Sequence, residues 1–239
     1  MIGANLNAFS IGKAVGRNNS GPRSWQYSGT SFSVAGQELN PRGITWDGLH
    51  FWVVGTSQDT VYQYTSAGVY TGTSFSVASQ TSAPLGIAWD GLHFWVVGDT
   101  ADTVYKYTSA GVYTGTSFST ASQDTNPQDI AWDGLHFWVI GGILRRVYKY
   151  TAAGVYTGTS FSVGSQELNP RGIAWDGSNF WVVGYNTDAV YQYTSAGVYT
   201  GTSFSVVSQA AGASGIAWDN YNFWVVGFDS DAVYKYSYL

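Results

Sequence analysis

The sequence predicts an all-β fold, a five-bladed β-propeller with four antiparallel strands in each blade. Each repeat contains four short segments rich in β-branched and aromatic residues, and no segment has a helical period. Four strands repeated every 40–45 residues are typical of a propeller blade. The repeats are 43 residues long and account for residues 25–239. They are marked by five Trp-Asp pairs, at Trp46-Asp47, Trp89-Asp90, Trp132-Asp133, Trp175-Asp176 and Trp218-Asp219.

The repeat that starts at residue 86 illustrates the predicted strands, which we name A to D. We expect them at 86–89, 94–97, 104–107 and 112–119, each bounded by Gly, Asp or Ser. Asp90-Gly91 is expected to close the A–B hairpin, and Gly111 to supply a positive φ in the C–D turn. Strand B is apolar on both faces, which suits a blade packed between two others. In strand D, alternation predicts that Val112 and Phe118 share one face.

The two ends of the repeat region predict how the ring closes. The repeats begin with a lone D-type segment at 27–34 and end after a C-type segment at 233–236. The first segment can therefore complete the last blade and remove the exposed sheet edges, as in a velcro closure. Residues 1–24 do not match the repeat, and we expect them to form an N-terminal arm that lies against the disc or contacts another subunit.

Composition limits the classes of function. Charged residues make up 10% of the 239 residues and the net charge is −5, which argues against a nucleic-acid partner. Cysteine is absent, so no disulfide or thiolate metal site is expected. No apolar run approaches the length of a membrane span, and no secretory signal is evident at the N-terminus. The low charge and the abundance of Ser, Thr, Gly, Trp and Tyr fit an extracellular or virion-associated protein such as a phage tail component.

The order of residues in each unit resembles the NHL repeat family. The match is carried by the segments 41–47 (PRGITWD) and 51–54 (FWVV), and then by Asp59, Val61, Tyr64 and Gly68. It covers about 25–239 and implies a propeller fold. It does not imply one chemistry, because such propellers include binding modules and a few enzymes. The near-identical copies and the high Trp content depart from the family pattern.

Differences between the five copies fall in two of the four connections. The A–B and C–D turns are almost constant, whereas the B–C turns and the D–A links vary. In an antiparallel blade these two variable connections emerge on the same side of the disc. One-sided variation indicates either a face specialised for contacts or simply turns with looser backbone demands.

The candidate ligand-binding residues lie in these variable connections. Tyr185 and Phe228 begin B–C turns, where an aromatic ring has little structural reason to be and can stack on a sugar. The twin D–A links ELNPR place polar side chains at equivalent positions, Asn40 and Arg42 in one, Asn169 and Arg171 in the other. Interblade hydrogen bonding is an equally good interpretation of these four. Arg145 and Arg146 interrupt the acidic pattern of the third B–C turn, either as an anion site or as a solvated pair.

Other polar residues are interpreted as structural. His50, His93 and His136 share one turn position in three adjacent blades, too far apart to bind one metal. The acidic residues that recur before strand C, and those of the Trp-Asp pairs, suit local turn hydrogen bonds. We identify no catalytic residues, no unique His or acidic cluster near the axis, and no metal or cofactor site.

These observations favour a non-enzymatic binding module that recognises glycans or a surface receptor through its variable face. A structural or protein-docking scaffold and an engineered propeller without a natural ligand remain alternatives. The sequence does not indicate the oligomeric state.

Overall fold

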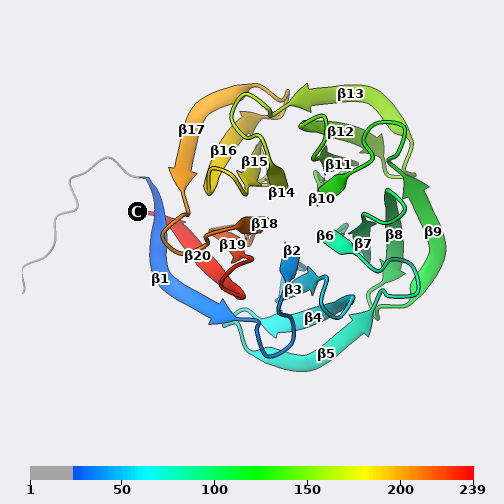
Figure 1. Ribbon diagram of the computed structural model, residues 1–239, viewed down its shortest axis with the longest axis horizontal. Helices are drawn as coiled ribbons and strands as arrows, with labels where there is room; N and C mark the ends of the chain where they lie inside the picture. Colours follow the sequence, from blue (N-terminus) through cyan, green and yellow to red (C-terminus); the bar gives the residue numbers. More distant parts are fainter. Residues whose placement is uncertain (1–23) are drawn as a thin grey trace, which may run out of the picture.

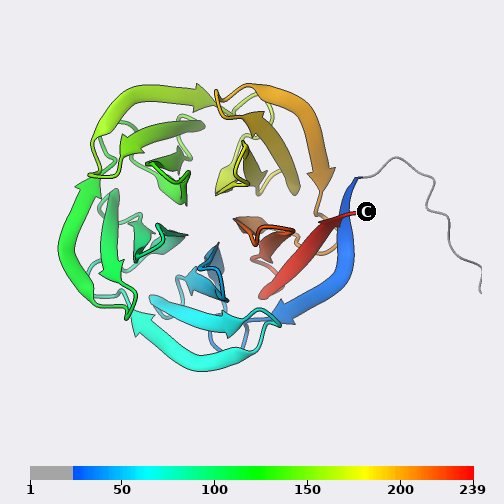
Figure 2. The same cartoon turned by 180° about the vertical axis from the view of Figure 1, so that it is seen from behind.

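The protein folds into a closed ring of five four-stranded sheets, seen in the computed structural model, which describes residues 24–239 (Figures 1 and 2). This confirms the predicted five-bladed propeller. The predicted arm, residues 1–24, lies outside the described residues except for Ser24. Across residues 24–239, no helix is both long and apolar enough to span a membrane.

Each blade follows the order A-B-C-D from the axis outward. Blade 1 contains β2 (Pro41–Trp46), β3 (His50–Gly55), β4 (Thr60–Thr65) and β5 (Tyr70–Ser76). Blade 2 contains β6 (Pro84–Trp89), β7 (His93–Gly98), β8 (Thr103–Thr108) and β9 (Tyr113–Ser119). Blade 3 contains β10 (Pro127–Trp132), β11 (His136–Gly141), β12 (Arg146–Thr151) and β13 (Tyr156–Ser162). Blade 4 contains β14 (Pro170–Trp175), β15 (Asn179–Gly184), β16 (Ala189–Thr194) and β17 (Tyr199–Ser205).

Blade 5 is assembled from both ends of the repeat region. It contains β18 (Ala213–Trp218), β19 (Phe223–Gly227), β20 (Ala232–Tyr238) and, on the outside, β1 (Trp25–Ser33). β1 pairs antiparallel with β20, with Trp25 opposite Tyr238 and Ser33 opposite Ala232. The predicted closure by the N-terminal strand is therefore confirmed, and the ring has no open blade.

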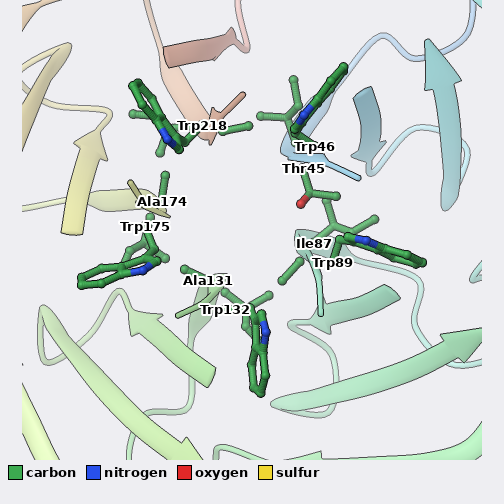
Figure 3. Close-up of a pocket in the computed structure, with 15 residues that line it drawn as sticks. Thr45, Trp46, Ile87, Trp89, Ala131, Trp132, Ala174, Trp175 and Trp218 are labelled. Atoms are coloured by element: carbon green, nitrogen blue, oxygen red, sulfur yellow. The ribbon is translucent and has the colours of Figure 1, made fainter. Parts of the chain in front are cut away.

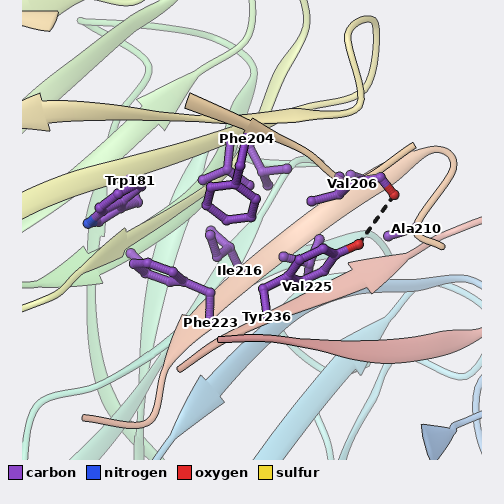
Figure 4. Close-up of a cluster of buried hydrophobic side chains, with 12 residues drawn as sticks. Trp181, Phe204, Val206, Ala210, Ile216, Phe223, Val225 and Tyr236 are labelled. Atoms are coloured by element: carbon purple, nitrogen blue, oxygen red, sulfur yellow. Dashed lines mark hydrogen bonds between the residues drawn. The ribbon is translucent and has the colours of Figure 1, made fainter. Parts of the chain in front are cut away.

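Apolar strands B fill the spaces between neighbouring blades. Between blades 4 and 5, Trp181 packs against Phe223 with ring centroids 4.7 Å apart, and Phe204 and Tyr236 complete the layer (Figure 4). The Tyr236 hydroxyl donates a 3.3 Å hydrogen bond to the carbonyl of Val206. Strand B is buried from its phenylalanine to its last residue, as its apolar faces predict.

The outer strands differ from the prediction. Val112 is 62% exposed whereas Phe118 is 9% exposed, so the two do not share a buried face. The strand begins at Tyr113, and its pairing with β8 shifts register between Tyr105 and Tyr107. Gly115 lies at this irregularity with φ of 81°. At this irregularity three residues of β9, 114–116, stand opposite the single residue Lys106 of β8, which interrupts the alternation on which the prediction depended.

The structure places the variable connections on one face. In every blade the first amide of the B–C turn donates to a carbonyl of the D–A link, as Thr56 N does to Asn40 O at 3.1 Å and Tyr185 N to Asn169 O at 3.1 Å. The two connections are thus joined along the same rim. We call this side the variable face, and the opposite side, formed by the A–B and C–D turns, the constant face.

Candidate functional site at the mouth of the axis

The strands A converge on the axis, and their first residues form the mouth on the variable face. Each strand A contacts the strand A of the next blade around the full ring. Five equivalent side chains follow the first residue of these strands. They are Arg42, Leu85, Gln128, Arg171 and Ser214. Because these five residues differ, the mouth is chemically asymmetric although the backbone is nearly five-fold.

A second set of side chains surrounds this inner set. It consists of the first residue after each strand B, at Thr56, Asp99, Gly142, Tyr185 and Phe228. The guanidinium carbon of Arg42 lies 4.2 Å from the ring centre of Phe228, which belongs to the adjacent blade 5. Arg171 lies over Tyr185 of its own blade at 5.8 Å. The structure thus pairs each of the two predicted arginines with one of the two predicted aromatic residues, and their role in ligand binding stays a prediction.

The two arginines lack an acidic partner at bonding distance. The Nη1 of Arg171 donates to Oε1 of Gln128 at 2.7 Å, so a neutral amide holds this guanidinium. Among the described residues, the ion pairs within 4.0 Å all join a histidine to an aspartate. Burial, and then the positive charge of Arg171, lowers the pKa of Arg42. Both guanidinium groups are therefore partly desolvated, and the charge of Arg171 acts on Arg42.

Asp99 is the acidic member of the mouth. Burial, followed by repulsion from Asp102, raises the pKa of the Asp99 carboxyl, while Arg171 and Arg42 act in the opposite direction. The charge of the same carboxylate acts to raise the pKa of both arginines, but the lowering effect of burial is larger. Asp99 therefore shares the field of the two guanidinium groups without forming an ion pair with either.

The other predicted site residues have different positions. The amide of Asn40 donates to Glu38 at 2.8 Å and that of Asn169 to Glu167 at 2.7 Å, so their backbones brace the D–A links. The side chain of Asn169 reaches Oδ1 of Asn186 at 3.5 Å. These contacts support the structural interpretation of the asparagine backbones and leave their side chains at the rim.

Among residues 24–239, no contact joins Arg145 or Arg146 to Arg42 or Arg171, the arginines of the mouth. Arg146 donates from Nε and Nη2 to Oγ of Ser160, at 3.2 and 2.9 Å, between strands β12 and β13. Arg145 is exposed and has a positive φ of 54°. The side chain of Arg146 is therefore engaged within its own blade, and Arg145 is a turn residue.

The sequence analysis missed one residue near the axis, Asp129. It occupies the position that is glycine in the other four blades, at Gly43, Gly86, Gly172 and Gly215. The sequence analysis expected no unique histidine or acidic cluster near the axis, and it did not consider this single acidic residue. The sequence shows the difference as PQD in place of PRG or PLG, but it does not show that this position lies near the axis.

The backbone packing explains why glycine prevails at this layer. A side-chain carbon placed on Gly43 would lie 2.9 Å from Cα of Gly86, and one on Gly172 would lie 3.0 Å from Cα of Gly215. Asp129 is accommodated because its carboxyl extends between blades: Oδ2 accepts the amide of Ile173 at 2.9 Å, and Oδ1 lies against Gly86. The side chain thus reaches the blades on both sides of its own.

The Asp129 carboxyl is 1% exposed, and its Oδ1 has no hydrogen-bond partner among the described residues. Burial raises the pKa of this carboxyl well above its usual value, although the amides of Ile173, Ile130 and Ile87 oppose the shift. An unpaired buried carboxylate is costly, so its presence requires an explanation.

Below this layer an axial cavity of about 110 Å³ occupies the half of the ring toward the constant face. It is lined by the last three residues of all five strands A, ending in Trp46, Trp89, Trp132, Trp175 and Trp218 (Figure 3). Four blades contribute alanine at the middle position, and blade 1 contributes Thr45. None of the residues at the mouth lines this cavity.

The aspartates of the Trp-Asp pairs make the expected local turn hydrogen bonds. Asp47 Oδ1 accepts the amides of Leu49 and His50, at 2.7 and 2.6 Å, and Oδ2 accepts Nε1 of Trp52 at 2.7 Å. The same bonds recur at Asp90, Asp133, Asp176 and Asp219. Asp59 and its equivalents have φ near 47°, the left-handed conformation that aspartate tolerates.

Comparison with known proteins gives the fold but no family. No protein-family model matches the sequence, so membership of the NHL family stays a resemblance, and the search of curated proteins gives no significant match. Among solved structures, the glutaminyl cyclase of Myxococcus xanthus is similar with a TM-score of 0.68 and 12% identity, over 91% of this chain and 98% of that one.

Two further structures show how varied the similar proteins are. The virginiamycin B lyase of Staphylococcus aureus matches with a TM-score of 0.56 and 14% identity, over 91% of this chain and all of that one. A chain of a nidogen–laminin complex matches with a TM-score of 0.55 and 13% identity, over 81% of this chain and 74% of that one. Enzymes and binding proteins share the propeller, so the fold does not distinguish between these classes.

Proposed function

We propose that the protein is a recognition module that binds an acidic glycan at the mouth of the axis on its variable face. The observation that carries the proposal is the pair of partly buried guanidinium groups of Arg42 and Arg171, each beside an aromatic ring and neither ion-paired with a carboxylate of residues 24–239. Arginine presents a planar set of donors that matches a carboxylate in two parallel hydrogen bonds.

The aromatic rings support a sugar as the carrier of that carboxylate. Phe228 and Tyr185 hold the arginines by stacking, which pre-organises the charged groups and reduces the entropy lost on binding. Tyr185 is 37% exposed and offers its ring and hydroxyl at the rim. Asp99 adds an acceptor for sugar hydroxyl groups.

Calorimetry with a matched pair of ligands tests the proposal: one oligosaccharide ending in a uronic acid and the same oligosaccharide ending in the neutral hexose. We expect the acidic ligand to bind more tightly than the neutral one. Arg42→Ala and Arg171→Ala should each weaken its binding by roughly 10-fold or more, the range for a lost charge-assisted hydrogen bond. Arg146→Ala removes an arginine of the same charge outside the mouth and should leave binding unchanged.

Three outcomes would overturn the proposal. Equal affinity for the neutral ligand would remove the role of the arginines, and loss of binding in Arg146→Ala alone would move the site. The absence of binding to acidic glycans would favour a scaffold that docks another protein. Mass spectrometry of the ligand after incubation adds a separate check, because a changed mass would identify the protein as an enzyme.

A further inference from the structure

The geometry points to an interaction surface on the other side of the disc: we propose that two copies of this chain form a face-to-face dimer through their constant faces. The observation that carries this inference is the separation of apolar and charged side chains between the two faces of the ring. The inference is independent of the proposed glycan site, because the mouth lies on the variable face and stays open in such a dimer.

Apolar side chains stand on the tips of the turns that form the constant face. Leu49, Leu92 and Leu135 are 65–67% exposed at the same position of three A–B turns, and Tyr221 is 80% exposed at this position in a fourth. Blade 5 has no C–D turn, but the last two residues of the chain lie at the corresponding place and are exposed. Each C–D turn exposes one valine by 62–63%, at Val69, Val112, Val155 and Val198.

Hydrogen bonds hold these tips in place. The amide of Leu49 donates to Oδ1 of Asp47 at 2.7 Å, and the amide of Val69 donates to Oγ1 of Thr65 at 3.1 Å. The equivalent bonds recur in blades 2 and 3. Because the backbone of each tip is fixed before any contact forms, burying its side chain against a partner costs little conformational entropy.

The centre of the same face is also apolar. The five tryptophans that end the strands A line the axial cavity and are half-buried (Figure 3). Strand A runs from the variable face to the constant face, so these rings lie inside the circle of A–B tips. Apolar residues therefore recur on this face from the axis outward. Single exposed apolar residues are ordinary, but a repeated set that covers one face is typical of a site of protein association.

Charge is distributed in the opposite way. Within residues 24–239, the turns of the constant face contain no lysine or arginine, and their acidic residues are the five aspartates of the Trp-Asp pairs. Each of these carboxylates accepts three hydrogen bonds inside its own blade.

The other charged residues of this range lie elsewhere. Ten acidic residues and four arginines belong to the variable connections or to the strand ends beside them, and three lysines lie in the middle of strands C. Two constant faces can therefore meet without bringing like charges together. In a face-to-face dimer, the excess of negative charge of each copy stays on the outer side.

These features favour a second copy over a lipid surface as the occupant. Interfacial binding to a membrane relies on lysine or arginine beside the apolar side chains, and the turns of the constant face have neither. A two-fold axis places the same ring of rigid tips on both partners. A stable interface buries about 800 Å² on each partner. The constant face is one of the two broad sides of a disc with 11349 Å² of accessible surface, which is large enough (Figures 1 and 2).

Blade 4 supplies a matched substitution for the test. Its A–B turn has Ser178 where three other blades have leucine, and the amide of Ser178 still donates to Oδ1 of Asp176 at 2.8 Å. The constant-face variant Leu49→Ser/Leu92→Ser/Leu135→Ser therefore removes three apolar tips and keeps a turn sequence that the ring already accepts.

The control variant removes three leucines from the variable face. Leu39→Ser/Leu144→Ser/Leu168→Ser changes side chains that are 56–60% exposed, close to the exposure of the leucines on the constant face. It therefore removes a similar apolar area from the opposite side of the disc. Circular dichroism and thermal melting verify that both variants are folded.

The measurement is sedimentation velocity of the full chain from low micromolar to near-millimolar concentration, with a parallel test of co-sedimentation with neutral phosphatidylcholine vesicles. We expect a concentration-dependent dimer for the full chain and for the control variant. The constant-face variant should raise the dissociation constant of the dimer by roughly 100-fold or more.

Three results would overturn the proposal: a full chain that stays monomeric at every concentration, a dimer unchanged in the constant-face variant, or a dimer lost in the folded control variant. Binding of a monomeric chain to the vesicles would also overturn it, and would identify a lipid surface as the occupant of the constant face.

Discussion

The indole Nε1 of Trp95 donates a 2.7 Å hydrogen bond to Oδ2 of Asp90, linking the A–B turn to the middle of strand B. The other carboxylate oxygen accepts the amides of Leu92 and His93, at 2.8 and 2.7 Å. One carboxylate thus shapes the turn and satisfies a buried indole. Because all five blades repeat the arrangement, it explains why the aspartate of each Trp-Asp pair recurs together with the second tryptophan of its repeat, the one in strand B.

Asp90→Asn should therefore destabilise the fold. The asparagine oxygen can still accept the two turn amides, but its NH₂ group would face the indole N–H, leaving that donor unsatisfied. We expect the free energy of unfolding to fall by about 1–3 kcal/mol, measured by urea denaturation. Asp102→Asn changes a turn aspartate that asparagine can replace in the left-handed conformation, and should change stability by under about 0.5 kcal/mol. Equal losses in the two variants would contradict this role.

The same carboxylate predicts a dependence of stability on pH. Burial raises the pKa of Asp90, but the hydrogen bonds from Trp95, His93 and Leu92 outweigh it, so the pKa in the folded state is below 3.8. A lowered pKa means that this stabilisation is complete above the unfolded-state value and is lost as the pH falls through the folded-state value. Melting temperatures between pH 2 and 6 should fall less steeply in Asp90→Asn. Parallel curves for both proteins would argue against it.

Closure of the ring predicts different effects for two truncations. Removal of residues 1–23 leaves β1 intact and should leave a folded ring, whereas removal of 1–36 deprives β20 of its partner and exposes its edge. The longer truncation also removes Trp25, which packs 4.7 Å from Phe223. We expect a markedly lower melting temperature and aggregation only for the longer truncation, by calorimetry and size-exclusion chromatography. Identical melting of both truncations would contradict the closure.

Arg145 offers a stabilising substitution. Its φ of 54° matches the values of 45–48° at Asp59, Asp102, Asp188 and Asp231, but arginine tolerates this conformation less well than aspartate. Arg145→Asp should raise the free energy of unfolding by roughly 0.5–1 kcal/mol, in urea denaturation. The reciprocal change Asp102→Arg should lower it by a similar amount. A loss of stability in Arg145→Asp would show that the arginine makes a compensating contact.

The sequence was sufficient for the architecture because the architecture is encoded locally and repeated. The turn residues, the apolar strands B and the lone first strand each predict one element that the structure contains. The outer strands were less predictable, since the irregularity at Gly115 adds two residues relative to the partner strand without changing the composition of the segment.

The candidate site was predictable only in part. Arg42 and Phe228 stand at opposite ends of the chain, and only the closed ring makes them neighbours. The sequence shows that Asp129 differs from its equivalents, but the tight packing around it depends on how closely five strands approach the axis. That distance is a property of the whole ring and has no local signature in any one repeat.

The meeting of Ser24 and Leu239 has a consequence for engineering. The amide of Ser24 donates to the carbonyl of Leu239 at 2.9 Å, and the amide of Leu239 returns a bond to Ser24 at 3.1 Å. A short peptide linker joining these two residues would allow circular permutation of the ring. New chain ends could then be placed in any C–D turn. Each such permutant would carry the mouth and the axial cavity unchanged while presenting its fusion points at a different blade.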